Sequence, residues 1–170
     1  MAKTISFGLS VSEIQKAKKQ IPQYQSELNA KTNTLVKRLA TIGLDTSKAV
    51  IERHRNGDGA TLGSARIETT STGEIVRMSV VVESDAILFL EFGSGITYNE
   101  GNENPLASEL GYGPGTYPGQ THADDPNGWW YQDDNGEWKH SYGIQADMPM
   151  YKASRAMREN VSKIAREVFK

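Results

Sequence analysis

Hydrophobic side chains near the start of the chain recur at steps of three, four and seven residues, which places them on one side of an α-helix. The stripe consists of Ile14, Ala17, Ile21, Tyr24, Leu28, Leu35, Leu39 and Ile42. Ser10 and Glu13 have the spacing of a capping box, which satisfies free N–H groups where a helix begins. Gly43 is suited to end the helix, because glycine readily adopts a left-handed conformation. We therefore predict a helix over residues 10–43.

Two residues interrupt this pattern, and a second helix is expected after it. Lys31 stands within the hydrophobic stripe. Pro22 has no N–H and its ring crowds the preceding turn, so we expect a kink or a break near Gln20. A shorter helix is predicted over 45–55, with Asp45 as its N-cap.

Two segments rich in β-branched residues follow, at 62–72 and 74–84. In the second segment, hydrophobic and polar side chains alternate before both faces become apolar, and we predict an antiparallel pair of strands. Residues 85–93 are predicted to form one or two helical turns that lead into a glycine bend. The bend residues are Glu91, Phe92, Gly93 and Gly95.

The composition changes over residues 94–142, which are rich in glycine, proline and tryptophan. Loops of this length are uncommon inside compact domains and are usually functional or mobile. Two aromatic segments, 128–132 and 137–141, flank a turn sequence of two aspartates, an asparagine and a glycine at 133–136. We predict an extended interaction loop that contains a β-hairpin.

The end of the chain has the clearest helical pattern. Its apolar face consists of Met150, Ala153, Met157, Val161, Ile164 and Val168. Asp147 is expected to be the N-cap, and Pro149 lies near the first helical position, where its missing N–H has little effect. The order of helix, strands, loop, hairpin and helix predicts an α+β fold. In that fold a small antiparallel β-sheet packs with a long N-terminal helix and a C-terminal helix, and a long Gly/Trp-rich loop and hairpin extend from it.

Length and composition agree with one domain over residues 1–170, with the interaction loop at about 94–142. Hydrophobic residues make up 37% and charged residues 24%, which is polar for a compact monomer. The net charge of −2 gives no global attraction to nucleic acid or an anionic membrane. The absence of cysteine excludes disulfides and thiolate metal sites. No stretch approaches the roughly 20 apolar residues of a membrane span, so we expect a soluble protein made in the cytoplasm.

One cluster could carry metal chemistry. His122, Asp124 and Asp125 could bind a metal ion and support a metal-dependent hydrolase, although a site needs further converging ligands. The alternative is that they are polar residues of a solvated loop. The glycine-rich segment 111–119 lacks the pattern of a phosphate-binding loop, and Ser94 lacks the glycine of a nucleophile elbow. No metal, cofactor or catalytic residue is therefore predicted.

The tryptophans leave two possibilities open. Trp129, Trp130, Tyr131 and Trp138 could stack on sugars, as in a carbohydrate-binding module, or on bases. The acidic residues around them disfavour phosphate groups. Aromatic anchors are also typical of protein–protein interfaces, which we consider the better explanation.

Three segments, taken in order, resemble the HK-ninety-seven-type tail-component family of long-tailed bacteriophages. The matching positions are Leu90, Glu91, Phe92, Gly93, Ser94 and Gly95; then Trp129, Trp130, Tyr131, Gly136 and Trp138; then Gly143, Ala146, Pro149, Met150 and Ala153. The chain departs from the family pattern where Met150 replaces a phenylalanine and Ser94 a threonine.

This resemblance implies a structural virion protein, not an enzyme, which forms a ring at the neck or upper tail and helps to join head to tail. We expect a homo-oligomer, a hexamer rather than a dodecamer. Its neighbours would be the connector or stopper, the tail terminator and the tail tube, with non-specific DNA in the channel and no membrane. The ring would assemble in the host cytoplasm and remain in the virion. The expected interface residues are Trp129, Trp130, Tyr131, Trp138, Tyr112 and Tyr117.

Overall fold

The computed structural model describes residues 8–54, 63–72, 75–84, 86–95, 104–112, 125–133 and 135–170. Its elements are α1 (Val11–His54), β1 (Ser64–Thr72), β2 (Ile75–Glu83), α2 (Ile87–Phe92), β3 (Ser94–Gly95), β4 (Trp129–Gln132), β5 (Trp138–Ser141), β6 (Gly143–Ile144) and α3 (Pro149–Val168). Within these ranges the strands form three antiparallel pairs, β1 with β2, β3 with β6 and β4 with β5. The predicted α+β fold is confirmed.

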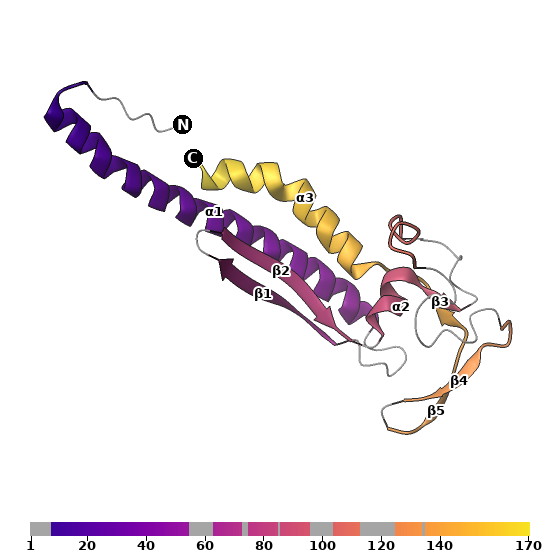
Figure 1. Ribbon diagram of the computed structural model, residues 1–170. Coiled ribbons are helices and arrows are strands. Elements are labelled where there is room, and N and C mark those ends of the chain that lie inside the picture. The colour runs from indigo at the N-terminus through magenta and orange to yellow at the C-terminus, as the bar shows by residue number, and fades with distance from the viewer. Residues whose placement is uncertain are drawn as a thin grey trace.

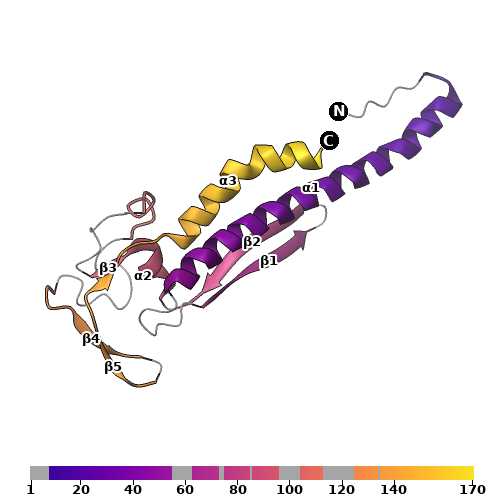
Figure 2. The same cartoon turned by 180° about the vertical axis from the view of Figure 1, so that it is seen from behind.

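The molecule is elongated along α1 (Figure 1). The β1–β2 hairpin lies along one side of this helix and α3 along another, and both contact its C-terminal half. Figure 2 shows the same arrangement from behind, with α2 and the two shorter strand pairs gathered near the C-terminal end of α1. The N-terminal half of α1 extends beyond the other elements.

The hydrophobic core lies where α1, β1 and α2 meet. Ile51 of α1, Ala65 of β1 and Leu90 of α2 are buried against one another. Half-buried apolar residues surround this cluster: Leu44, Val82, Ala86, Ile87 and Ile144. This cluster therefore joins α1, β1 and α2, and Phe92 with Ala107 forms a second small buried cluster beside it.

The first helix is one continuous element, so the prediction of two helices separated at Gly43 is wrong. Gly43 is buried in the middle of α1, where Met157 of α3 and Val80 of β2 approach it closely. The glycine is used for close packing, and contacts of the neighbouring turns with α3 and β2 hold the helix together. Asp45 is an exposed residue inside the helix and not an N-cap.

The predicted break at Pro22 is also absent, because α1 continues through this residue. Proline removes one helical hydrogen bond, the one to the carbonyl of Lys18, and this region is exposed, so water can solvate that carbonyl. The start of the helix agrees with the prediction. Ser10 Oγ accepts the Glu13 N–H at 3.3 Å and donates to Glu13 Oε2 at 2.6 Å.

The strand pair is confirmed. β1 and β2 are antiparallel, and the register runs from Ser64 opposite Glu83 to Thr72 opposite Ile75. The predicted turns at 85–93 correspond to α2, after which Gly93 has a left-handed φ of 81°. These elements agree with the sequence because local alternation and a glycine are enough to define them.

The predicted N-cap of α3 is wrong. Met148 occupies that position in a left-handed conformation (φ 51°, ψ 55°) and makes no side-chain capping bond. The carboxylate of Asp147 instead binds His54 Nε2 at 2.8 Å, Arg53 at 3.2 Å and the Lys152 ammonium. Asp147 therefore ties the end of α1 to the beginning of α3. Partial burial opposes the ionisation of Asp147, but the hydrogen bonds from Lys152 and His54 outweigh it and lower its pKa.

Replacing Asp147 with asparagine should lower stability at neutral pH, because Arg53, Lys152 and His54 lose their carboxylate partner. The folded-state pKa lies below the ordinary 3.8, so this contribution is present above 3.8 and is lost as pH falls through the folded pKa. Thermal unfolding of both proteins from neutral pH to below 3.8 should show their difference shrinking with acid. Asp45→Asn, on the exposed face of α1, is the matched control. A difference that does not change with pH would contradict this role of Asp147.

Substitutions at Gly43 should separate close packing from helix propensity. A Cβ there would lie 2.8 Å from Met157 Sδ and 3.1 Å from Val80 Cγ2. For Gly43→Ala, a shift of the flexible Met157 and a propensity gain of about 1 kcal/mol should leave stability nearly unchanged. Gly43→Leu should cost about 1–3 kcal/mol by overpacking. Urea denaturation measures both values, and equal stability of Gly43→Leu and the wild type would rule out the close packing.

Candidate functional site

A buried carboxylate caps the C-terminal helix from another element. Glu91 of α2 is 7% exposed. Its Oε2 accepts the N–H of Met150 at 2.8 Å, and its Oε1 accepts the N–H of Tyr151 at 2.9 Å. These N–H groups belong to the first turn of α3 and have no partner within the helix. A negative charge at this end of a helix is also favoured by the helix dipole. Glu91 thus supplies the cap that Met148 cannot.

The surroundings of Glu91 complete its hydrogen bonding. Asn104 is buried and donates from Nδ2 to Glu91 Oε1 at 2.8 Å. Burial raises the pKa of the Glu91 carboxyl, while the N–H groups of Met150 and Tyr151, the Asn104 amide and the Lys152 charge oppose that rise. All three direct partners are donors, so the geometry suits the ionised carboxylate. Both oxygens are occupied by protein groups, which indicates a structural role for this carboxylate.

The neighbouring backbone strengthens the same contact. The carbonyl of Leu90 accepts the N–H groups of Asp147 at 2.9 Å and Met148 at 3.1 Å. Strand β3 pairs with β6, and Ser94 Oγ accepts the Ile144 N–H at 3.2 Å. Segment 90–95 is therefore bound to segment 143–151 through backbone and side chains. This pair of segments is termed the α2–α3 joint.

The predicted bend residues all belong to the joint or pack beside it. Phe92 stacks on Tyr112 with ring centroids 4.4 Å apart. Gly95 has a left-handed φ of 63°, and a Cβ there would lie 2.5 Å from the carbonyl oxygen of Tyr142. Gly93 turns the chain out of α2. The Glu-Phe-Gly-Ser-Gly sequence at 91–95 is therefore explained by capping, stacking and close backbone approach.

The tryptophan-rich hairpin is confirmed, with β4 and β5 paired from Trp129 opposite Ser141 to Gln132 opposite Trp138. Asp133 orders its turn by accepting the N–H groups of Asn135 at 2.9 Å and Glu137 at 3.0 Å. Lys139 Nζ lies 2.9 Å from Asp133 Oδ2. Hydrogen bonding from Lys139 lowers the pKa of Asp133. The hairpin thus has its own polar network at the turn.

The two faces of the hairpin differ in exposure. Trp129, Tyr131, Lys139 and Ser141 share one face and are half-buried. On the opposite face Trp130 and Trp138 are each 64% exposed. The His140 ring stands edge-on to Trp130 at 4.9 Å and to Tyr142 at 4.6 Å, and Tyr142 is 53% exposed. These four residues, Trp130, Trp138, His140 and Tyr142, are termed the aromatic face.

The predicted interface residues thus fall into different places. Trp130 and Trp138 lie on the exposed aromatic face, whereas Trp129 and Tyr131 lie on the half-buried one. Tyr112 is half-buried through its stacking on Phe92. Tyr117 lies outside the described residues.

Of the candidate metal ligands, His122 and Asp124 lie outside the described residues, and Asp125 accepts the N–H of Asn127 at 2.9 Å. The described ranges contain no group of three or more His, Cys, Asp or Glu residues placed to hold a metal ion. Over the same ranges, no helix combines the length and the apolar character needed to cross a membrane.

Sequence reasoning missed three residues of these sites. His140 and Tyr142 follow Trp138 at alternate positions, so strand alternation could have placed them on its face. Asn104 gave no comparable signal, because it follows Glu91 by 13 positions without any regular spacing. Its partnership with Glu91 is a tertiary contact.

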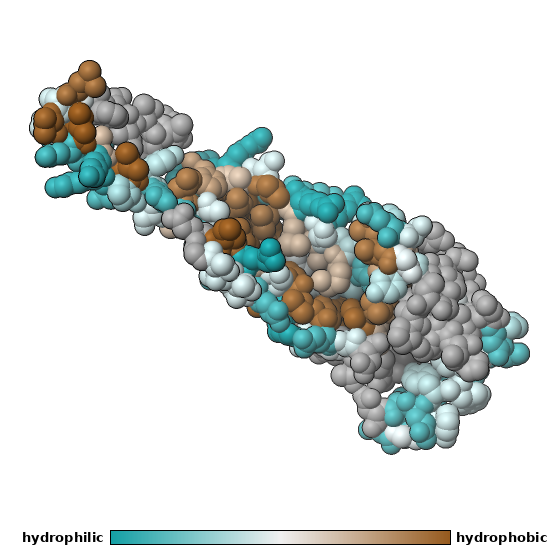
Figure 3. Space-filling view, in the orientation of Figure 1, coloured by the Kyte–Doolittle hydropathy of each residue, from teal (hydrophilic) through white to brown (hydrophobic). Residues whose placement is uncertain are grey.

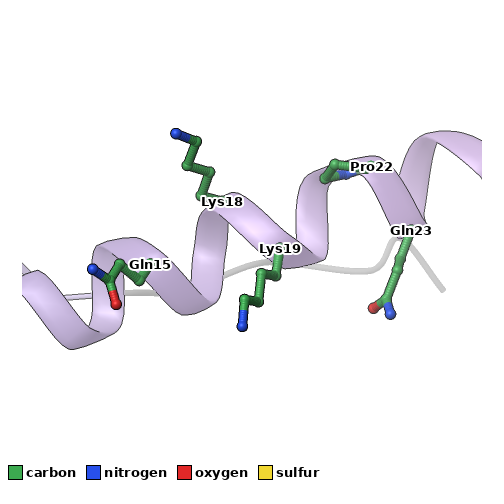
Figure 4. A pocket seen from close by; sticks show the side chains of 5 residues that line it. All are labelled: Gln15, Lys18, Lys19, Pro22 and Gln23. Carbon is green, nitrogen blue, oxygen red and sulfur yellow. The ribbon is translucent and has the colours of Figure 1, made fainter.

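A hollow on α1 is a further candidate (Figure 4). It is lined by Gln15, Lys18, Lys19, Pro22 and Gln23, all from one helix. Lys18 points away from Lys19 and Gln23, so the polar ends do not converge on one ligand. An open hollow of this kind lacks the enclosure and the convergent polar groups of a small-molecule site.

No protein-family model, curated protein or solved structure matches this chain. The resemblance to the HK-ninety-seven-type tail-component family therefore depends on the order of elements along the chain and on short motifs, chiefly at residues 90–95, 129–138 and 143–153. In the structure the first and third of these segments meet in the α2–α3 joint, and the second forms most of the hairpin.

Substitution of Glu91 should destabilise the whole fold. Glu91→Ala leaves three donors without their partner and should lower the free energy of unfolding by about 3 kcal/mol or more, since each unsatisfied buried donor costs about 1–3 kcal/mol. Glu91→Gln keeps the shape but turns an amide N–H₂ toward one donor, which should cost about 1–3 kcal/mol. Denaturant unfolding measures both.

Glu109→Ala is the control, since Glu109 is exposed and should change stability by less than about 0.5 kcal/mol. If the two Glu91 variants are as stable as this control, the capping role is wrong.

Proposed function

We propose that this chain is a structural component of a tailed-bacteriophage particle. It forms a ring at the neck or upper tail and helps to complete the tail and join it to the head. The single observation that carries the proposal is the aromatic face, whose two indoles remain 64% exposed in the isolated chain. Large exposed aromatic side chains are typical anchors of protein–protein interfaces.

The joint supports this role of the hairpin. β6 leads directly from the hairpin, and its pairing with β3 fixes it beside α2 and the start of α3. The hairpin, and with it the aromatic face, is therefore attached to the core by the hydrogen bonds between β3 and β6 and by those from Asp147 and Met148 to the Leu90 carbonyl. An anchor held in this way loses less conformational freedom when a partner binds.

The same proposal includes the partners. The chain assembles as a homo-oligomeric ring, a hexamer rather than a dodecamer, beside the connector or stopper, the tail terminator and the tail tube. DNA passes through the channel without sequence-specific contact. A closed ring of identical copies needs two different surfaces on each copy, which an elongated molecule with unlike ends provides. The chain has no catalytic role in this proposal, and its place is the virion.

Carbohydrate binding is the second candidate, because Trp130 and Trp138 could also stack on sugar rings. A saturable change of tryptophan fluorescence with soluble oligosaccharides, lost in Trp130→Ala, would favour it. No observation on the described residues favours the metal-dependent hydrolase.

Trp130→Ala and Trp138→Ala should each weaken self-association, because removal of a buried aromatic anchor costs about 2 kcal/mol or more, roughly thirtyfold in the dissociation constant. Sedimentation velocity across a concentration series measures the change. Ile75→Ala is the matched control, since Ile75 is an apolar residue 71% exposed at the far end of the β1–β2 pair. An oligomer unaffected by both tryptophan substitutions would refute the proposed interface.

The proposed location of the chain at the neck or upper tail of the virion can be tested separately. Gold-labelled antibody against the chain, viewed by electron microscopy on intact particles of the phage that encodes it, should mark the neck or upper tail. Labelling confined to the capsid or the fibre tips, or absent from particles, would contradict the proposal.

A further inference from the structure

Charge is distributed unevenly between the two long helices and the rest of the chain. Helices α1 and α3 together contain 13 Lys and Arg residues and six Asp and Glu residues, a net charge of +7. The remaining residues contain six Lys and Arg and 15 Asp and Glu, a net charge of −9. The small net charge of the whole chain therefore combines a basic pair of helices with an acidic remainder.

The two basic helices form a groove where they pack together. The groove has a volume of about 370 Å³. It is lined by Lys37, Arg38, Thr41 and Ile42 of α1 and by Asn160, Lys163, Ile164 and Glu167 of α3. Ile164 is buried and Ile42 half-buried, whereas all four charged residues are exposed. These eight residues are termed the basic groove.

The positive charge of the basic groove is only partly neutralised. Glu167 is the one acidic residue among the eight, and Arg38 Nη2 already binds its Oε2 at 2.6 Å. Lys37 and Lys163 have no ion pair with any described residue. The hydrogen bond from Arg38 lowers the pKa of Glu167, and the charges of Arg38, Lys163 and Lys170 lower it further. These cations therefore produce a positive potential at the groove.

Further cations continue the groove toward the end of α3. Arg166 and Lys170 follow Lys163 at steps of three and four, which brings the three side chains to the same side of the helix over about 10 Å. Lys31 Nζ donates to the backbone oxygen of Lys170 at 3.0 Å, so a cation of α1 lies at the same end. Figure 3 shows hydrophilic side chains, in teal, projecting at the upper edge of the molecule over α3.

The neighbouring carboxylates do not cancel this charge. Glu159 of α3 is occupied by Arg155, whose Nε lies 2.8 Å from Glu159 Oε1. Asp45 lies one helical turn beyond Thr41 on α1, and Lys48 follows it three residues later. The basic end of the groove is therefore the part between the middle of α1 and the end of α3.

The arrangement favours an extended polyanion over a small phosphate compound. A small-molecule site needs polar groups that converge on its ligand. The Thr41 hydroxyl and the Asn160 amide instead donate to backbone carbonyl groups of their own helices, at 3.0 and 2.9 Å. The cations are spread along the groove, which suits a DNA duplex with one negative charge about every 1.7 Å. The acidic remainder of the chain repels such a ligand, so only the helix side can face it.

We propose that the basic groove, with Lys31, Arg166 and Lys170 at its end, binds the phosphodiester backbone of double-stranded DNA without reading its base sequence. The inference rests on the proposed function for the choice of duplex DNA, which the proposed ring encloses. It adds the orientation of each copy, with α1 and α3 toward the channel and the hairpin away from it. Contacts to phosphate carry no sequence information and allow DNA to slide past the protein.

Fluorescence anisotropy with two labelled duplexes of unrelated sequence tests the inference. The dissociation constant should lie at about 10⁻⁴–10⁻⁶ M at physiological salt and be equal for both duplexes. With about three to five phosphate contacts, a plot of the logarithm of the association constant against the logarithm of the salt concentration should have a slope of about −3 to −4.5. Absence of binding at low salt, or tight binding of one duplex only, would overturn the inference.

Substitutions in the groove should change this slope. Lys163→Gln should lower its magnitude by about 0.9, and Lys37→Gln with Lys163→Gln by about twice that. Glutamine is a good helix former, so circular dichroism should be unchanged. Arg77→Gln is the matched control, because Arg77 is exposed on β2, has no ion pair with a described residue, and loses the same charge. Equal effects of Lys163→Gln and Arg77→Gln would contradict the groove.

Competition experiments test the class of ligand. Poly-glutamate at the same concentration of charge should displace little of the bound duplex, and inorganic phosphate should show no saturable binding. Displacement by poly-glutamate as effective as that by unlabelled duplex would identify an acidic polypeptide as the partner. Saturable binding of phosphate that is lost in the Lys37, Lys163 double variant would identify a site for a small anion. Either result overturns the inference.

Sedimentation velocity without DNA separates this inference from the proposed ring. The Lys37, Lys163 double variant should keep the oligomer of the wild type. Loss of that oligomer would show that the groove binds an acidic part of another copy, which overturns the DNA contact. A wild-type monomer that binds DNA with the expected slope would refute the ring and leave the groove. An oligomer that binds neither duplex would refute the groove and leave the ring.

Discussion

The structure depends on one carboxylate placed where a helix begins. Glu91 satisfies the first N–H groups of α3 and is itself held by the buried amide of Asn104. Since Leu90 belongs to the core with Ile51, the same short helix joins the core, α3 and the strand that leads to the hairpin. The direction of α3 is therefore set by these hydrogen bonds around residues 90–95 together with the packing of α3 along α1.

The small size of the buried core corresponds to the distribution of the remaining apolar residues. The core occupies the middle of the molecule, and the largest exposed hydrophobic side chains lie mainly at its two ends, on the N-terminal part of α1 and on the hairpin. In the proposed ring, part of this apolar surface would be buried only between copies. Folding and assembly would then contribute to the same free energy, because contacts between copies would supply burial that the single chain lacks.

Sequence patterns predicted the elements whose causes are local. Alternation defined the β1–β2 and β4–β5 pairs, and a capping serine defined the start of α1. Predictions failed where tertiary contacts determine the local structure. Local rules place Gly43 at the end of a helix, but in the structure it lies within α1 and packs against Met157 and Val80. The prediction that Asp147 caps α3 failed for the same reason. Its carboxylate instead forms a hydrogen bond with His54, which is nearly a hundred positions away in the sequence. The bond between Asn104 and Glu91 has no local pattern at all.

The unbroken course of α1 has a mechanical consequence. A helix of 44 residues is about 66 Å long, and only its C-terminal half is clamped by α3 and the strands. A tilt of about 5° at the clamp therefore moves the tip of the free half, about 33 Å long, by roughly 3 Å. The missing hydrogen bond at Pro22 adds a compliant point along the rod. Small repacking near Gly43 is thus amplified into a larger displacement of the free tip. In the proposed ring, this displacement would let identical subunits tolerate small irregularities in spacing.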